Sequence, residues 1–335
     1  MSLPEGQIRT KPNHSCLLCG IEGVVLYRGC CDPYFGAPGR WQFRRCPSSN
    51  CGLIWIDPLP HPDDLHLAYR RYFTHGEQDG ESFRASRLRS ILYQVYLLSV
   101  AIPANLVGLG QSKRERDRMF LRNLSLGKVL DVGCGDGRFL HRMQKAGWSV
   151  DGVDFDAKAV AAAKLRYGLV LRHGDLASAD FPSGAYDAVT LSHVIEHVPD
   201  PIGLLVEVRR VLKQGGRMVV VTPNSESYGH REFKEHWYGL DAPRHLQIFS
   251  TRTLSETGRR AGFRVIETAS TAASADIFIG ASCSIRNAPG HHANPEPSPN
   301  LFRTLRAMAW QYREHFALRN DPACGEEAVL VAVKD

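Results

Sequence analysis

Long apolar runs are scarce in this chain, and their scarcity limits the classes of protein to which it can belong. The first thirteen residues are polar and lack the apolar core of a signal peptide, so we expect a cytoplasmic protein. The 41 basic and 35 acidic residues leave a formal net charge of only +6, which permits an anionic partner without requiring one. Internal repeats are absent too, which argues against solenoids and propellers.

One uncharged stretch comes close to the length of a membrane span. It runs from Ser90 to Gln111 and is flanked by arginines on both sides. Pro103, Asn105 and other polar residues dilute it, so we predict a helical lid over a substrate pocket. A transmembrane helix and a helix lying on a bilayer, with peripheral membrane contact at residues 91–110, remain open as alternatives.

Cysteine is concentrated at the start of the chain, where six of the nine cysteines fall within 51 residues. They include a C-x2-C pair, Cys16 and Cys19, and a C-x4-C pair, Cys46 and Cys51. Four thiolates on two turns suit a closed tetrahedral zinc site, so residues 1–60 are predicted to form a zinc-ribbon-like module with structural zinc. Free thiols are the alternative, with Cys30 and Cys31 as further candidate ligands.

The rest of the chain predicts a helical linker or lid over residues 61–120 and an α/β domain over residues 121–335. Short apolar segments alternate with helical patterns from residue 128 onward, which is typical of a parallel sheet covered on both faces. We expect residues 225–249 to be an insert that contacts substrate, and the proline-rich residues 282–300 to form a flexible loop. The expected strands are Lys128–Val132, Ser149–Asp154, Val170–His173, Ala185–Leu191, Arg217–Thr222, Phe263–Thr268 and Glu327–Val333.

The clearest chemical signal lies in Lys128–Leu140, which reads KVLDVGCGDGRFL. An apolar strand, a glycine turn and a helix follow one another, so a ligand can approach bare backbone at a helix N-terminus. Arg138 stands where a dinucleotide-binding fingerprint requires its third glycine.

Three carboxylates stand at or near the ends of the expected strands, where doubly wound sheets bind ligands. Asp131 precedes the glycine turn, Asp154 closes the second strand and Asp175 closes the third. Asp154 follows Gly133 by 21 residues, the spacing at which a carboxylate can accept hydrogen bonds from ribose hydroxyls.

Taken in order, DVGCGDG, GVDFD, HGD, YDAVTLSHVIEHVPDP and LKQGGRMVVVTPN resemble the motifs of class I S-adenosylmethionine-dependent methyltransferases. The resemblance implies a Rossmann-like fold with a doubly wound, mostly parallel sheet of seven strands, and S-adenosyl-L-methionine as cofactor. In a protein of this family, the glycine turn would hold the methionine part of the cofactor. The acidic residues would contact the amino group, the ribose and the adenine of the cofactor. The implied cofactor-binding residues are Asp131, Gly133, Cys134, Gly135, Asp154, Phe155, Asp175, Leu176 and Ser192.

Two further segments resemble bacterial methyltransferases of secondary metabolism and surface-sugar pathways. They are the cysteine-knuckle region, CLLCG with RRCPSSNCGLIWIDPLP and then Tyr69–Phe73, and the segment Trp237–Phe249. This resemblance implies a small-molecule or glycan-intermediate acceptor, methylated on oxygen or carbon. An oxygen acceptor must lose its proton, and His193 and His245 are the candidate catalytic bases, although a structural role is open for each.

The segment His193-Val-Ile-Glu196-His197 also matches the inverted zinc-protease pattern, which requires a position within a helix. It further resembles a stretch of ubiquinone-type O-methyltransferases that is associated with a divalent cation. Packing and helix-start roles for Glu196 and His197 are the third interpretation. Two alternative functions remain: a zinc-ribbon RNA methyltransferase, which the modest charge disfavours, and a non-catalytic scaffold with a cofactor-like fold. The oligomeric state is left open.

Overall fold

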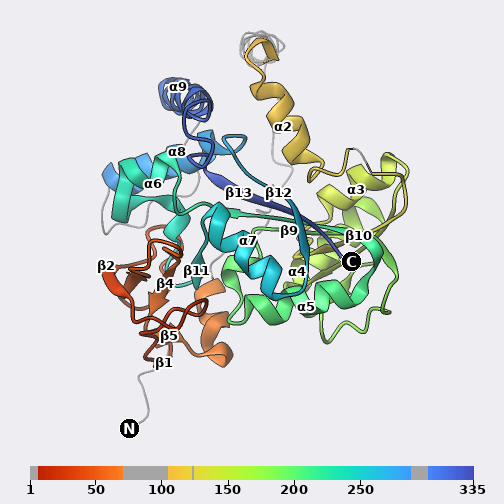
Figure 1. The fold of residues 1–335 in the computed structure, drawn as a ribbon, viewed down its shortest axis with the longest axis horizontal. Coiled ribbons are helices and arrows are strands. Elements are labelled where there is room, and N and C mark those ends of the chain that lie inside the picture. The colour runs from red at the N-terminus through yellow and green to blue at the C-terminus, as the bar shows by residue number, and fades with distance from the viewer. Residues whose placement is uncertain (1–6, 71–104, 123, 288–300) are drawn as a thin grey trace.

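A mixed seven-stranded sheet forms the centre of the computed structural model, which describes residues 7–70, 105–122, 124–287 and 301–335, without the side chains of residues 301–305 (Figure 1). The strand order is β12-β13-β10-β9-β6-β7-β8, and β13 alone runs against the others. This arrangement confirms the predicted fold class. The bounds are β6 Lys128–Val132, β7 Ser149–Asp154, β8 Arg172–His173, β9 Tyr186–Ser192, β10 Leu212–Pro223, β12 Arg264–Thr271 and β13 Glu327–Val333.

Helices cover both faces of this sheet, because apolar side chains point alternately to either side along each strand. Val129 packs with residues of α3 (Arg138–Lys145) and α4 (Ala157–Tyr167) on one face. Leu130, the next residue, packs with residues of α5 (Pro201–Val211) and α7 (Thr251–Arg260) on the other. Three of these helices begin at side-chain caps: Asp156 for α4, Asp200 for α5 and Ser250 for α7.

The cysteine-rich segment forms a second, smaller sheet that is completed by a distant part of the chain. Its order is β11-β4-β3-β2, and β11 (Gln247–Ile248) belongs to the predicted insert. Figure 1 shows these strands gathered beside the large sheet. The remaining bounds are β1 Thr10–Lys11, β2 Val24–Cys30, β3 Trp41–Arg45, β4 Ile54–Asp57 and β5 Leu59–Pro60, with β1 paired to β5.

The insert and the C-terminal helices share a core with this small sheet. Phe43 and Ile56 pack in one cluster with Trp237, Leu246 and Phe278. The insert is therefore an ordered, buried part of the fold rather than a surface loop. Its elements are α6 Tyr228–Phe233 and the 3₁₀ turns η3 Lys234–His236 and η4 Tyr238–Leu240; α8 Ala275–Asn287 and α9 Leu301–Ala317 pack above them.

Two sequence expectations need correction or lie beyond the described residues. Residues 282–287, expected in a flexible loop, form the last part of α8, and residues 288–300 lie outside the described chain. Most of the uncharged stretch Ser90–Gln111 lies outside it as well, and its end begins α2 (Leu109–Asp117). None of the helices within the described ranges combines the length and the apolar character needed to cross a bilayer.

Candidate functional site

A cavity of about 1260 Å³ opens at the carboxyl ends of the parallel strands. It is bounded by the glycine turn, by the 3₁₀ segment η1 (Pro62–Tyr69), by the insert and by α8. Every residue that the sequence assigns to cofactor binding or catalysis lines this one cavity. They are Asp131, Gly133, Cys134, Gly135, Asp154, Phe155, Asp175, Leu176, Ser192, His193 and His245.

The glycine turn between β6 and α3 exposes backbone to the cavity. Gly133 and Gly135 have positive φ angles of 71° and 53°, a region in which L residues with side chains are strained. A Cβ atom at Gly133 would lie 2.3 Å from Cγ2 of Val194. Only glycine therefore fits at position 133, and the bare backbone of Gly133 and Gly135 lines the cavity at the N-terminus of α3.

Two buried carboxylates stand beside this turn. Asp154 accepts hydrogen bonds from the backbone N–H groups of Gly135 (2.7 Å) and Asp156 (2.8 Å), which fixes its orientation. Asp131 accepts a 2.6 Å hydrogen bond from the Thr190 hydroxyl. Burial, and then the charge of Asp154, raise the pKa of Asp131 to about 7. A cationic group placed here would favour the ionised form of Asp131.

The other end of the cavity combines an exposed acid with apolar side chains. Asp175 is held by the backbone N–H of Ser178, and hydrogen bonds from that residue lower the pKa of Asp175. Leu176 is buried, whereas Phe155 is 57% exposed. The ring of Tyr69 meets Phe155 edge to face with centroids 5.3 Å apart. A planar ligand could lie against Phe155 and Leu176.

His193 lies within a chain of alternating charges. Its Nδ1 is 3.2 Å from Oε1 of Glu196, and its Nε2 is 2.9 Å from Oε1 of Glu327. Arg116 of α2 donates to the same oxygen of Glu327 and to the Ser192 hydroxyl. Burial opposes charge on the imidazole, but the two carboxylates prevail and raise the pKa of His193 to about 9. The charged ring has no lone pair to receive a proton.

His197 and His245 are arranged differently from His193. Their rings meet edge to face with centroids 4.6 Å apart. The Nδ1 atoms lie 3.1 Å from the Arg244 carbonyl and 2.8 Å from the Gly239 carbonyl respectively, which assigns the proton to Nδ1 and leaves Nε2 as an acceptor. Burial, and then the neighbouring His245, lower the pKa of His197 to about 4.

The H-x-x-E-H pattern does not form a zinc-protease site. Its last three residues make the single 3₁₀ turn η2 (Ile195–His197) instead of a stretch within a helix, and both nitrogens of His193 face carboxylates. Side-chain atoms of Glu196, His197 and His245 do lie within 4.8 Å of one another, close enough to share a cation.

Arg244 ties the insert to the N-terminal segment. Its guanidinium is fully buried, donates from Nη1 to Asp32 at 2.7 Å and donates from Nε to Asp241 at 2.9 Å. Nη1 also donates to the carbonyl of Ala68, next to Tyr69. Three segments that are distant in the sequence thereby meet at the wall of the cavity.

The four predicted zinc ligands come together away from this cavity. The Sγ atoms of Cys16 and Cys51 lie 3.6 Å apart, and those of Cys19 and Cys46 lie 3.3 Å apart. A tetrahedral zinc ion with Zn–S bonds of about 2.3 Å requires sulfurs roughly 3.8 Å apart. The quartet therefore fits zinc and is too wide for disulfides. Cys30 and Cys31 do not belong to it.

Several residues at the cavity were not assigned a role from the sequence. Tyr69, Tyr238 and Phe278 supply aromatic surface, and Tyr69 places its hydroxyl 3.0 Å from Nδ1 of His197. Tyr238 lies within the resembling segment Trp237–Phe249, whereas Phe278 lies outside every motif. Asp241 stands four residues before His245 within the insert, a spacing that could have suggested a pair. Glu327 has no local pattern, because its partners come from other segments.

Comparisons with known proteins agree with this geometry. Residues 110–268, a little under half of the chain, match the family model described as "Methyltransferase domain". A Mycolicibacterium smegmatis protein named as a probable S-adenosylmethionine-dependent methyltransferase is 36% identical over 146 residues, covering 42% of this chain and 53% of that protein. The ubiquinone biosynthesis O-methyltransferase of Sodalis glossinidius is 37% identical over 102 residues, covering 29% and 41% respectively.

Among solved structures, an S-adenosylmethionine-dependent methyltransferase from Thermotoga maritima is 20% identical with a TM-score of 0.44, covering 71% of this chain and 96% of that one. The chain spans about half the length of the curated relatives it matches.

Proposed function

We propose that this chain, which contains a methyltransferase domain of Rossmann-like fold, transfers the methyl group of S-adenosyl-L-methionine to a small-molecule or glycan-intermediate acceptor. One observation carries the proposal. Nine residues with cofactor-binding assignments and two candidate bases, drawn from separate strands and from the insert, line a single cavity. They converge at the carboxyl edge of a doubly wound sheet, and this edge is where proteins of this architecture bind ligands.

The cofactor half would be built around the glycine turn. Asp154, already oriented by two backbone N–H groups, would accept from the ribose hydroxyls, and Asp131 would face the amino group. Phe155 and Leu176 would flank the adenine, with Asp175 at its edge. The cofactor supplies an activated methyl group, so the residues of this chain mainly align the partners and exclude water.

The acceptor half would lie between η1, the insert and α8. For an oxygen acceptor we assign the proton-accepting role to His245, whose Nδ1 is held by the Gly239 carbonyl. Its Nε2 lies 3.8 Å from a carboxylate oxygen of Asp241, beyond hydrogen-bond distance, and so can accept a proton from the acceptor. His193 receives a positioning role, because both of its nitrogens are engaged by Glu196 and Glu327. A carbon acceptor would bind against the same residues and would depend less on a catalytic base.

Structural zinc on Cys16, Cys19, Cys46 and Cys51 completes the proposal. Four thiolates leave no open position on the metal, so it would hold the two cysteine turns together and take no part in catalysis. The turns connect to the sheet that carries β11, so zinc would stabilise the support of the acceptor half.

Calorimetry with S-adenosylhomocysteine tests the cofactor assignment. Asp154→Ala should weaken binding at least tenfold, because each lost hydrogen bond to a charged acceptor contributes about 1.5–3 kcal/mol. Asp151→Asn on the same strand β7 is the matched control, since Asp151 bonds Lys128 and Tyr186 instead. Well-folded wild-type protein that binds neither S-adenosylhomocysteine nor S-adenosylmethionine would refute the proposal.

His245→Gln tests the acceptor half once a turnover assay with labelled methyl donor has found an acceptor. It should lower kcat and leave S-adenosylhomocysteine binding unchanged. An unchanged kcat for an oxygen acceptor would remove His245 from the base role.

A further inference from the structure

A second cavity lies outside the methyl-transfer site, between α2 and α3. Its volume is about 460 Å³, within the range of small-ligand pockets, and we call it the arginine pocket. Arg114, Arg118, Arg122 and Arg142 line it together with apolar residues. None of the functions assigned above uses it.

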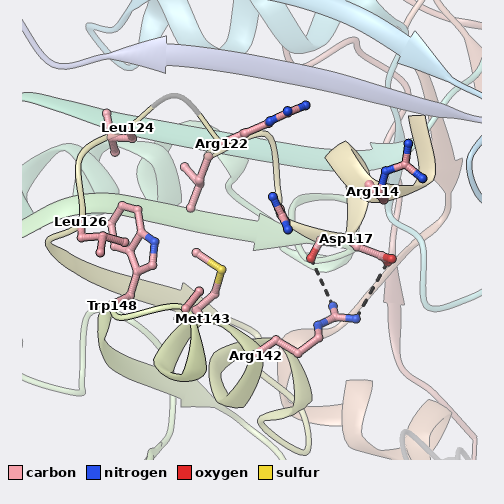
Figure 2. Close-up of a pocket in the computed structure, with 11 residues that line it drawn as sticks. Arg114, Asp117, Arg122, Leu124, Leu126, Arg142, Met143 and Trp148 are labelled. Carbon is pink, nitrogen blue, oxygen red and sulfur yellow. Dashed lines mark hydrogen bonds and ion pairs between the residues drawn. The ribbon is translucent and has the colours of Figure 1, made fainter. Parts of the chain in front are cut away.

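The lining of the arginine pocket is divided by polarity. Figure 2 shows Leu126 and Trp148 together on one side, with Met143 next to them, and Arg142 reaching Asp117 on the other. Met143 and Trp148 are only 5% and 6% exposed and belong to the core of the large sheet, so this side is firmly held. A pocket with one apolar side and one cationic side matches a ligand that is itself divided in this way.

The arginine pocket has more positively charged side chains than carboxylates that pair with them. Arg142 pairs with Asp117 at 3.9 Å, and Arg122 pairs with Glu115 at 3.0 Å. Among the described residues, the Arg114 guanidinium donates only to the neutral side chain of Asn105. The Arg118 guanidinium makes no ion pair or hydrogen bond with any residue that the structure describes. Four arginines therefore face two carboxylates, and two positive charges remain for an anion.

We infer that the arginine pocket binds an amphiphilic anion, a phosphate or carboxylate attached to an apolar tail. The guanidinium groups of Arg118 and Arg114 would bind the anion, and Trp148, Met143 and Leu126 would cover the tail. The same chemistry belongs to a free acyl or aryl phosphate and to an anionic lipid headgroup. Asp117 and Arg142 also line the large cavity, so this ligand would lie against the outer wall of the proposed methyl-transfer site.

Titration calorimetry with decyl phosphate, without methyl donor, tests this inference independently of the proposed function. Decyl phosphate should bind at least tenfold more tightly than inorganic phosphate or decanol, and its binding should change the fluorescence of wild-type protein but not that of Trp148→Phe. Vesicles of phosphatidylcholine with and without phosphatidic acid distinguish a lipid headgroup from a free ligand. Retention of the protein by the acidic vesicles alone assigns the site to a headgroup. Binding of monomeric decyl phosphate alone assigns it to a free ligand.

Arg118→Gln is the decisive variant, because Arg118 has no partner in the described structure whose loss could disturb folding. It should weaken binding of decyl phosphate, or of acidic vesicles, about tenfold. The matched control is Arg260→Gln, which removes the same charge from an exposed pair with Glu256 on α7, across the sheet. Equal weakening by both variants, equal affinity for inorganic phosphate, or no binding to either decyl phosphate or acidic vesicles would overturn the inference.

Discussion

His193 provides a sharp test of the electrostatics described above, because the structure predicts that it is charged at neutral pH. Its pKa of about 9 lies above the ordinary value of 6.5 owing to Glu196 and Glu327. A raised pKa in the folded state means that the ion pairs contribute their full stability below about pH 6.5 and lose it as the pH rises through 9. The stabilisation should therefore decline on the alkaline side of neutrality.

The size of this effect follows from the pKa difference. At 1.36 kcal/mol for each pH unit, the step from 6.5 to about 9 sets a ceiling of roughly 3 kcal/mol. A third of the His193 side chain is accessible from the cavity, so solvent screens the pairs, and we expect about 1–2 kcal/mol.

Urea unfolding of wild type and His193→Gln at pH 6 and pH 10 provides the assay. The difference in free energy of unfolding between the two proteins should be smaller at pH 10 by about 1–2 kcal/mol. His66→Gln is the matched control, because His66 is exposed and its ring bonds, within the part of the chain that the structure describes, only the Asp63 carbonyl. A wild-type-to-variant difference that is the same at both pH values would refute a charged His193 and would restore it as a candidate base.

Three further predictions follow from the same contacts. Affinity for S-adenosylhomocysteine, measured by calorimetry, should rise between pH 6 and 8 as Asp131 ionises, and Asp131→Asn should abolish that rise; a flat wild-type profile would contradict it. Cys46→Ser should lose zinc in metal analysis, whereas Cys30→Ser should keep it. Arg244→Met should lower the free energy of unfolding, measured with urea, by about 3–5 kcal/mol, because the buried carboxylates of Asp32 and Asp241 lose their partner. Arg252→Met, at an exposed ion pair, should lower it by about 1 kcal/mol or less.

The convergence of the proposed cofactor-binding residues on one cavity could be predicted from the sequence because each part is local. A strand, a glycine turn and a helix within Lys128–Leu140 fix where the backbone is bare, and Asp154 and Asp175 follow from the ends of the next strands. Hydrophobic alternation then determines which way each strand faces. The four cysteines are also local, since two short turns bring two ligands each.

The charge state of His193 could not be predicted in this way. Its second carboxylate, Glu327, lies 134 residues further along the chain, and a sequence pattern around His193 contains no trace of it. The burial of residues 225–249, which the sequence marks only as an insert that contacts substrate, could not be predicted for the same reason. This segment is polar and rich in aromatics, as a surface loop can be, and it becomes buried only because β11 pairs with β4.

The proposed acceptor half is thus assembled from segments that no single stretch of sequence describes. Arg244 joins Asp32, Ala68 and Asp241 through its hydrogen bonds, and His245 follows Arg244 directly. Since the cysteine-rich segment supplies Asp32 and the strand β4, which pairs with β11, the orientation of His245 depends on that segment being folded. Zinc removal should therefore alter turnover and the KM for the acceptor more than the affinity for the cofactor, whose site rests on the large sheet. Equal losses of both would mean that the two halves of the cavity fold as one unit.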